Sequence, residues 1–270
     1  KDKNMSKDRY NPREIKNKIS SAKNEMMSID SFAKVEFDHK VVEVYKEYQQ
    51  KLKNGNSVDF DDLLILPIKL FRNYPRVLEE YQDRYKYILI DEYQDTNEAQ
   101  YTFSKLLSAK YRNIFVVGDN DQAIYAFRGA NYKNILNFEK DYPEAKTILL
   151  EENYRSTKTI LNAANSVIKN NHERKDKNLW SNNATGNKIK YKEVANEKEE
   201  ASFVGEEIKK LLSKGVNEEE IAVLYRTNAQ SRVIEEEMLK KNIKYRVIGS
   251  FYFYNRKEIK DLLCYLRLIN

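Results

Sequence analysis

Cysteine and histidine are scarce in this 270-residue sequence, and their scarcity excludes several kinds of site. The one cysteine, Cys264, rules out an intramolecular disulfide and fits the reducing cytoplasm, where we expect the protein to work. The two histidines, His39 and His172, lie far apart, which argues against a zinc site. No apolar run approaches the roughly 20 residues of a membrane span, and no secretion signal is visible. We therefore expect no membrane partner.

Glycine is also rare, and its placement excludes one phosphate-binding motif. None of the seven glycines belongs to a G-x-x-x-x-G-K-[ST] loop, whose backbone amides and lysine hold phosphates in many nucleotide hydrolases. A chain without this loop lacks a complete phosphate site of that kind.

Neither sign of charge dominates, although the net charge is +6. Lysine and arginine concentrate in residues 1–23 and again in residues 169–192. A basic surface permits a polyanionic partner but does not establish one, because a solvated face explains these clusters equally well.

Hydrophobic periodicity predicts helices first and then an alternation of strands and helices. Residues 1–57 have helical spacing, and residues 59–84 predict one or two short helices interrupted near Pro75. Apolar strands are then predicted at residues 85–91, 112–119, 145–150, 188–195, 220–226 and 244–250, with helices between them. The alternation predicts an α/β fold with parallel sheets covered by helices.

Acidic residues follow two of the predicted strands. Asp91 and Glu92 come directly after the first, and Asp119 follows the second. Because ligands bind at the carboxyl ends of parallel strands, these carboxylates predict a site for Mg²⁺ and phosphate. Glu92 would then orient and deprotonate an attacking water.

Two alternatives compete for the same carboxylates. Asp95 and Thr96 could simply cap the next helix. Alternatively, Asp91, Glu92, Asp95 and Asp119 could form the site of a carboxylate metal nuclease.

The loop "GDNDQAIYAFRGAN", residues 118–131, carries polar and aromatic side chains together. Gln122 can hydrogen-bond a phosphate or a water, and Tyr125 and Phe127 can stack on bases. The competing interpretation buries both rings in the core. In an extended segment, Tyr125 and Phe127 would share one face while Arg128 pointed the other way.

Together these segments resemble the UvrD/PcrA/Rep-type superfamily 1 ATP-dependent DNA helicases. The motifs that carry the resemblance are "VDFDDLL" (58–64), "DEYQDTN" (91–97), "GDNDQAIYAFRGA" (118–130), "LEENYRST" (150–157), "LYRTNAQSR" (224–232) and "FYNRKEIKDLLCYLRLI" (253–269). Asn120 and Ala123 depart from the family's usual Asp and Ser. The resemblance covers essentially the whole chain.

The resemblance implies two partial RecA-like motor domains with a helical insertion at the N-terminus. Residues 1–57 would be the insertion segment, residues 58–149 the C-terminal part of the first motor domain and residues 150–270 the N-terminal part of the second.

The resemblance also implies how ATP and Mg²⁺ would be bound. Asp91 would hold Mg²⁺ and Glu92 would be the general base. Gln122 and Arg155 would contact the γ-phosphate, Arg155 in the manner of an arginine finger, and Tyr154 would stack on adenine. Taken alone, Arg155 could instead form a surface ion pair, and Tyr154 could pack at a strand end.

A second set of residues would line the path of single-stranded DNA. In this resemblance Phe127 is the base-stacking aromatic, accompanied by Tyr125, Arg128 and Phe60. Phe60 could equally be a core residue.

The implied function is that of a fragment of a helicase that couples ATP hydrolysis to 3′-to-5′ movement on single-stranded DNA and to unwinding of partial duplexes. Accessory loading or repair proteins would be further partners. Because the phosphate-binding loop is missing, we expect the fragment alone to be inactive. The alternatives are a catalytically silent single-strand DNA-binding or interaction fragment, and the metal nuclease.

Overall fold

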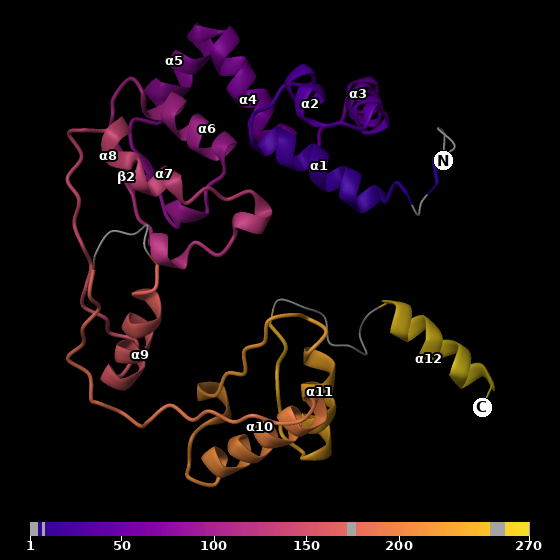
Figure 1. Ribbon diagram of the computed structural model, residues 1–270, viewed down its shortest axis with the longest axis vertical. Coiled ribbons are helices and arrows are strands. Elements are labelled where there is room, and N and C mark those ends of the chain that lie inside the picture. Colours follow the sequence, from indigo (N-terminus) through magenta and orange to yellow (C-terminus); the bar gives the residue numbers. More distant parts are fainter. Residues whose placement is uncertain (1–4, 7–8, 172–176, 249–256, 270) are drawn as a thin grey trace. The chain divides into compact units, whose positions relative to one another are not determined.

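The computed structural model describes residues 5–6, 9–171, 177–248 and 257–269 (Figure 1). The chain divides into two compact units, Lys1–Asn187 and Lys188–Asn270, and each is described by itself. Within the described ranges no helix combines the length and apolar character that crossing a membrane would require.

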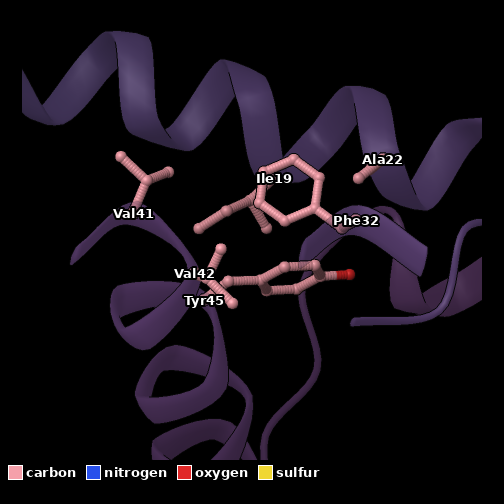
Figure 2. Close-up of a cluster of buried hydrophobic side chains, with 6 residues drawn as sticks. All are labelled: Ile19, Ala22, Phe32, Val41, Val42 and Tyr45. Carbon is pink, nitrogen blue, oxygen red and sulfur yellow. The ribbon is translucent and has the colours of Figure 1, made fainter. Parts of the chain in front are cut away.

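Three helices open the first unit, as the periodicity of residues 1–57 predicts: α1 (Pro12–Asn24), α2 (Ile29–Val35) and α3 (His39–Asn54). Their apolar faces form one core, which Figure 2 shows: Ile19, Ala22, Phe32, Val41, Val42 and Tyr45. The rings of Phe32 and Tyr45 meet edge to face with centroids 5.5 Å apart. The helices therefore form a small packed layer of their own.

A buried ion pair joins this layer to the next helix, α4 (Asp62–Asn73). Lys23 Nζ of α1 lies 2.7 Å from Asp59 Oδ2 and 2.8 Å from Asp62 Oδ1, and its side chain is buried. α4 ends before Pro75, where α5 (Pro75–Arg84) begins, so the predicted interruption is confirmed.

Two short parallel strands follow, β1 (Ile88–Ile90) and β2 (Ile114–Val116), in the register Ile88 to Ile114. The connecting helix α6 (Glu98–Ser108) packs on α4 through a cluster that contains Ile65, Ile68 and Ala99. This strand–helix–strand unit brings the carboxyl ends of both strands to one edge. Helices and a parallel sheet in the described residues are consistent with the predicted α/β class.

The remaining predicted strands are wrong in the part of the chain that the structure describes. Residues 145–150, 188–195, 220–226 and 244–248 form no ladder, and residues 249–250 lie outside the described ranges. One isolated bridge, between Glu152 and Trp180, is present instead. A strand is stable only when a neighbour accepts and donates its backbone hydrogen bonds, and these segments have no such neighbour among the described residues.

The first unit continues through short helices α7 (Lys133–Leu136) and α8 (Phe138–Asp141) to α9 (Lys158–Ile168). The second unit contains α10 (Glu197–Leu212), α11 (Ser231–Lys240) and α12 (Lys257–Ile269). Asn196 caps α10, since its Oδ1 accepts from the Lys198 and Glu199 amides at 3.1 and 3.0 Å. Ile208, Met238 and Ile243 form the core between α10 and α11.

Candidate functional site

The end of β1 delivers two exposed carboxylates, Asp91 and Glu92. Glu92 has left-handed backbone angles (φ 50°, ψ 43°), which cost a residue with a side chain roughly 1 to 2 kcal/mol. Asp91 Oδ1 accepts from the Glu92 amide at 2.9 Å, and the Tyr93 amide donates to the Val117 carbonyl at 2.9 Å. These bonds hold the sharp turn by which the chain leaves the strand.

The end of β2 is attached to the same turn through a side chain. The Asp119 amide donates to Gln94 Oε1 at 2.9 Å, and Gln94 Nε2 donates to Glu92 Oε2 at 2.8 Å. Gln122 Nε2 donates to Asp119 Oδ2 at 2.8 Å. The sequence-predicted residues Glu92, Asp119 and Gln122 are therefore brought together in one hydrogen-bonded cluster.

Gly118 makes this close approach possible. A Cβ at this position would lie 2.6 Å from Gln94 Oε1 and 2.8 Å from Ile135 Cδ1, closer than real contacts allow. A larger residue here would have to displace Gln94 or Ile135, because the backbone after β2 runs directly against the Gln94 amide.

Asp119 is the most strongly paired of the carboxylates. Lys177 Nζ forms an ion pair with Asp119 and lies 3.6 Å from Asp121 Oδ2. Burial opposes ionisation of Asp119, but the hydrogen bonds from Lys177 and Gln122 outweigh it and lower the pKa of this carboxyl. Asp119 is thus held as an anion between a lysine and an amide.

The surroundings of Asp95, unlike those of Asp119, oppose ionisation of its carboxyl group. Burial, and then the negative charge of Glu92, raise the pKa of the Asp95 carboxyl above its ordinary value. Its Oδ1 is buried and has no hydrogen-bond partner among the residues that the structure describes. An unpaired buried acceptor beside a second carboxylate fits a site that receives a donor or a cation.

The interpretation of Asp95 as a helix cap is wrong, because Asn97 caps α6. Asn97 Oδ1 accepts from the Gln100 amide at 2.8 Å, and Gln100 Oε1 accepts from the Asn97 amide at 2.9 Å. This reciprocal capping box provides hydrogen-bond acceptors for the backbone N–H groups at the start of α6 without Asp95 or Thr96.

The carboxylates fit Mg²⁺ bound together with phosphate better than a metal held by protein alone. Among the described residues no group of three or more ligating side chains forms a metal site. Mg²⁺ commonly takes one or two carboxylates and completes its shell with waters and substrate phosphates, which suits the exposed Asp91. A nuclease that relies on four protein carboxylates gains no support from this geometry.

Tyr154 and Arg155 lie in the segment before α9. Tyr154 is 78% exposed, and its hydroxyl donates to Glu152 Oε2 at 2.8 Å. Asn153 Oδ1 accepts from the Arg155 amide at 3.0 Å, while the exposed Arg155 guanidinium has no hydrogen bond or ion pair within the described ranges. The structure joins neither side chain to Glu92 or Gln122 by a hydrogen bond, so their roles at the nucleotide stay predictions.

The aromatic loop after Gln122 is exposed. Phe127 is 68% and Tyr125 38% exposed, and their ring centroids lie 6.0 Å apart. The expectation of an extended segment is wrong, because Ala126–Arg128 forms a 3₁₀ turn. The turn brings the Arg128 guanidinium over the Tyr125 and Phe127 rings, at 5.2 and 5.5 Å from the centroids.

The core interpretation of these aromatics fails, and the same is true of Phe60, which is 89% exposed. Phe60 lines a pocket of about 690 Å³ together with Tyr10, Ile19 and Tyr48. The role of these residues in DNA binding stays a prediction.

Sequence analysis missed two residues of the cluster. Gln94 stands inside the motif "DEYQDTN", and the structure alone shows that its side chain turns inward between the two strand ends. Lys177 is one of several basic residues in the range 169–192. Nothing in their sequence pattern indicates that Lys177 pairs with Asp119.

Comparisons with known proteins agree with the resemblance in the sequence. The family described as UvrD/REP helicase N-terminal domain matches residues 1–143, and the UvrD-like helicase C-terminal domain matches residues 148–270. Proteins named ATP-dependent DNA helicase PcrA from Staphylococcus aureus (strain NCTC 8325 / PS 47) and Staphylococcus epidermidis (strain ATCC 12228 / FDA PCI 1200) are each 53% identical over the whole chain. The chain spans 37% of the length of these relatives.

Proposed function

Because the chain belongs to the UvrD/REP helicase family, we propose that it is part of an ATP-dependent helicase that moves 3′ to 5′ along single-stranded DNA in the cytoplasm. The names of the relatives, which are 53% identical, support ATP and DNA as ligands. Residues 1–57 are the helical insertion segment, and residues 58–149 and 150–270 belong to two RecA-like motor domains. Partial duplex DNA is the substrate that the full-length protein unwinds.

The observation that carries the proposal is the hydrogen-bonded cluster at the ends of β1 and β2. Glu92 stands beside Asp91 at one strand end, and Gln122 is joined to Asp119 at the other. Carboxylates and an amide at the carboxyl edge of a parallel sheet suit a bound nucleotide and Mg²⁺. Asp91 would contribute to the Mg²⁺ site.

Glu92 acts as the general base in this proposal. Its Oε2 accepts from Gln94, so Oε1 is the oxygen left to take a proton from the attacking water. ATP would be the substrate, and attack of this water on the γ-phosphorus would break the bond to the β-phosphate and release ADP. Gln122 and Arg155 donate hydrogen bonds to the γ-phosphate, and the planar guanidinium suits phosphate oxygens.

Tyr154 and the aromatic loop provide the stacking surfaces. Tyr154 is exposed and would stack on adenine. Phe127, Tyr125 and Arg128 form one exposed cluster, which would receive successive bases, and Phe60 would extend the same path.

We infer that the 270 residues alone do not hydrolyse ATP. The chain has no G-x-x-x-x-G-K-[ST] loop, and that loop supplies most of the contacts to the β- and γ-phosphates. The full-length protein would supply it from residues outside this chain.

A strand-displacement assay tests the proposal. The full-length protein should separate a partial duplex with a 3′ single-stranded tail only when ATP and Mg²⁺ are present, and the 270-residue chain should not. Mg²⁺-dependent cleavage without ATP would support the nuclease instead. Single-strand binding by the full-length protein without DNA-stimulated phosphate release would support the silent binding fragment.

A further inference from the structure

Gln94 is a buried amide that no part of the proposed chemistry has yet used. Gln94 is only 1% exposed. Its Nε2 donates to Glu92 Oε2 at 2.8 Å, and its Oε1 accepts from the Asp119 amide at 2.9 Å. Only one orientation of the amide satisfies both neighbours, because the Asp119 N–H can only donate and the Glu92 carboxylate can only accept.

The surroundings leave this side chain little room to move. The Asp95 amide donates to the Glu92 carbonyl at 2.9 Å, which closes the turn that carries Gln94. On the other side, the missing Cβ of Gly118 leaves the space that Gln94 Oε1 occupies. Gln94 is therefore fixed by the same backbone that ends the two strands.

We propose that Gln94 is a positioning residue, which holds the Glu92 carboxylate in place and connects it to the loop that carries Gln122. This inference rests on the proposed function, in which Glu92 is the general base. The connection runs from Glu92 through Gln94 to the backbone and side chain of Asp119, and from there to Gln122 Nε2.

The hydrogen bond from Gln94 restricts the orientation of the Glu92 carboxylate. With Oε2 held by an N–H donor, the carboxylate cannot rotate freely, and Oε1 keeps one direction toward the water. A shift of the Gln122 loop moves the Asp119 amide, on which the Gln94 orientation depends. The orientation of the base is then coupled to the group that contacts the γ-phosphate.

If Gln94 had only a structural role, its variants would affect kcat differently. If Gln94 only fixes the loop after β2, the acceptor for the Asp119 amide is sufficient. The substitution Gln94→Glu keeps that acceptor and nearly the same shape but replaces the donor with a carboxylate beside Glu92. Gln94→Met keeps the length of the side chain and removes both hydrogen bonds without adding charge.

The experiment measures kcat, KM for ATP, affinity for a non-hydrolysable ATP analogue and melting temperature in the full-length protein. Rates are normalised to the fraction that binds single-stranded DNA. Gln94→Glu and Gln94→Met should each lower kcat about 10- to 100-fold, by analogy with the loss of outer-shell residues that orient metal ligands. KM and analogue affinity should stay within about threefold, since no contact to the nucleotide is lost.

Gln82→Glu is the matched control. Gln82 is another buried glutamine, and its Nε2 donates to the Leu106 carbonyl at 2.7 Å, away from the cluster. Its variant should keep wild-type kcat. If Gln94→Glu does not fold, Gln94→Met replaces it in the wild-type and Glu92→Gln backgrounds, because it places no second charge beside Glu92.

A double variant separates positioning from structure. In a Glu92→Gln background, Gln94→Glu should lower kcat no further, because the base that it positions is gone. An equal loss in both backgrounds, or wild-type kcat in Gln94→Glu, would overturn the inference. If wild-type protein shows no DNA-stimulated turnover, or Glu92→Gln retains it, the proposed function itself fails.

Discussion

The two sides of the proposed nucleotide site are built differently. At the ends of β1 and β2, Glu92, Asp119 and Gln122 are tied together by side-chain hydrogen bonds through Gln94. In the segment before α9, the Arg155 guanidinium has no polar partner in the part of the chain that the structure describes. The side that carries Glu92 is held in place by hydrogen bonds, and the Arg155 guanidinium on the other side is free to bind a ligand.

In the proposed function, this difference suits the two sides to separate tasks. A group that must direct a water toward phosphorus benefits from being fixed before the nucleotide arrives. An arginine that stabilises charge on the γ-phosphate must exchange its water for phosphate oxygens, and an existing ion pair would compete with that step. Variants on each side test whether the two sides are as separate as their contacts indicate.

The largest expected effect belongs to Arg155. In the full-length protein, Arg155→Ala should lower kcat by ~10³–10⁵-fold, the range typical of arginine fingers, because the guanidinium would stabilise the charge that develops on the γ-phosphate. Affinity for single-stranded DNA without nucleotide should not change. Steady-state ATPase assays and fluorescence anisotropy with labelled DNA measure both quantities.

Arg76→Ala is the control, since Arg76 is an exposed arginine of α5. It should leave both quantities unchanged. Equal losses of DNA affinity and turnover in Arg155→Ala would mean that this segment has a folding role.

A smaller effect is expected at Phe127, in the loop that also carries Gln122. Stacking is worth ~1–3 kcal/mol per base, so Phe127→Ala should weaken single-strand binding roughly 5- to 150-fold. The salt dependence of binding should stay nearly constant, because no phosphate contact is lost. Titrations at several salt concentrations measure both.

The melting temperature distinguishes stacking from packing. Phe127 is 68% exposed, so its truncation should change stability little, whereas truncation of a core Phe costs ~3–5 kcal/mol. Phe37→Ala, at a phenylalanine that is 95% exposed, provides the control for loss of a surface ring. A large drop in melting temperature with intact DNA affinity would disprove the stacking role.

The smallest effect concerns the electrostatics of Asp119. Because its pKa is lowered in the folded chain, ionised Asp119 stabilises the fold at pH values above the ordinary aspartate pKa of about 3.9. Asp119→Asn should lower the free energy of unfolding by ~1.5–3 kcal/mol at pH 7, the usual worth of hydrogen bonds to a charged group. The difference should shrink as the pH falls through the lowered folded-state pKa.

Urea titrations of the 270-residue chain between pH 7 and pH 3 measure this difference. Asp261→Asn, at an exposed aspartate of α12, is the control and should have little effect. A loss of stability in Asp119→Asn that does not depend on pH would show that the ion pair with Lys177 contributes nothing.

The sequence predicts the strand-end site better than it predicts the sheets. Apolar runs ending in Asp91 and Asp119 are local patterns, and the two strands that carry them find each other through the short connection of α6. The runs at 145–150, 188–195 and 220–226 are also predicted as strands but have no paired neighbour in the described ranges. A local pattern indicates that a segment tends to form a strand, whereas a stable strand also requires a neighbouring strand to pair with.

Within the site, the sequence predicts which residues carry chemistry but not what orients them. Glu92 and Gln122 are recognisable from motif and position. The inward turn of Gln94 depends on the left-handed angles of Glu92 and on the close approach at Gly118, which arise only when both strand ends meet. Arg128 shows the same limit, because its stacking on Tyr125 and Phe127 follows from a 3₁₀ turn that the pattern did not reveal.

The central claim is that the fixed side of the site contains a general base. The most direct test compares DNA-stimulated ATP hydrolysis by the full-length protein with that of its Glu92→Gln variant, while ATP binding is followed separately. The substitution is nearly isosteric and removes the base, so ATP affinity should stay the same and kcat should fall by ~10²–10⁴-fold. A fall of less than about tenfold, far below the usual contribution of a general base, would contradict the account.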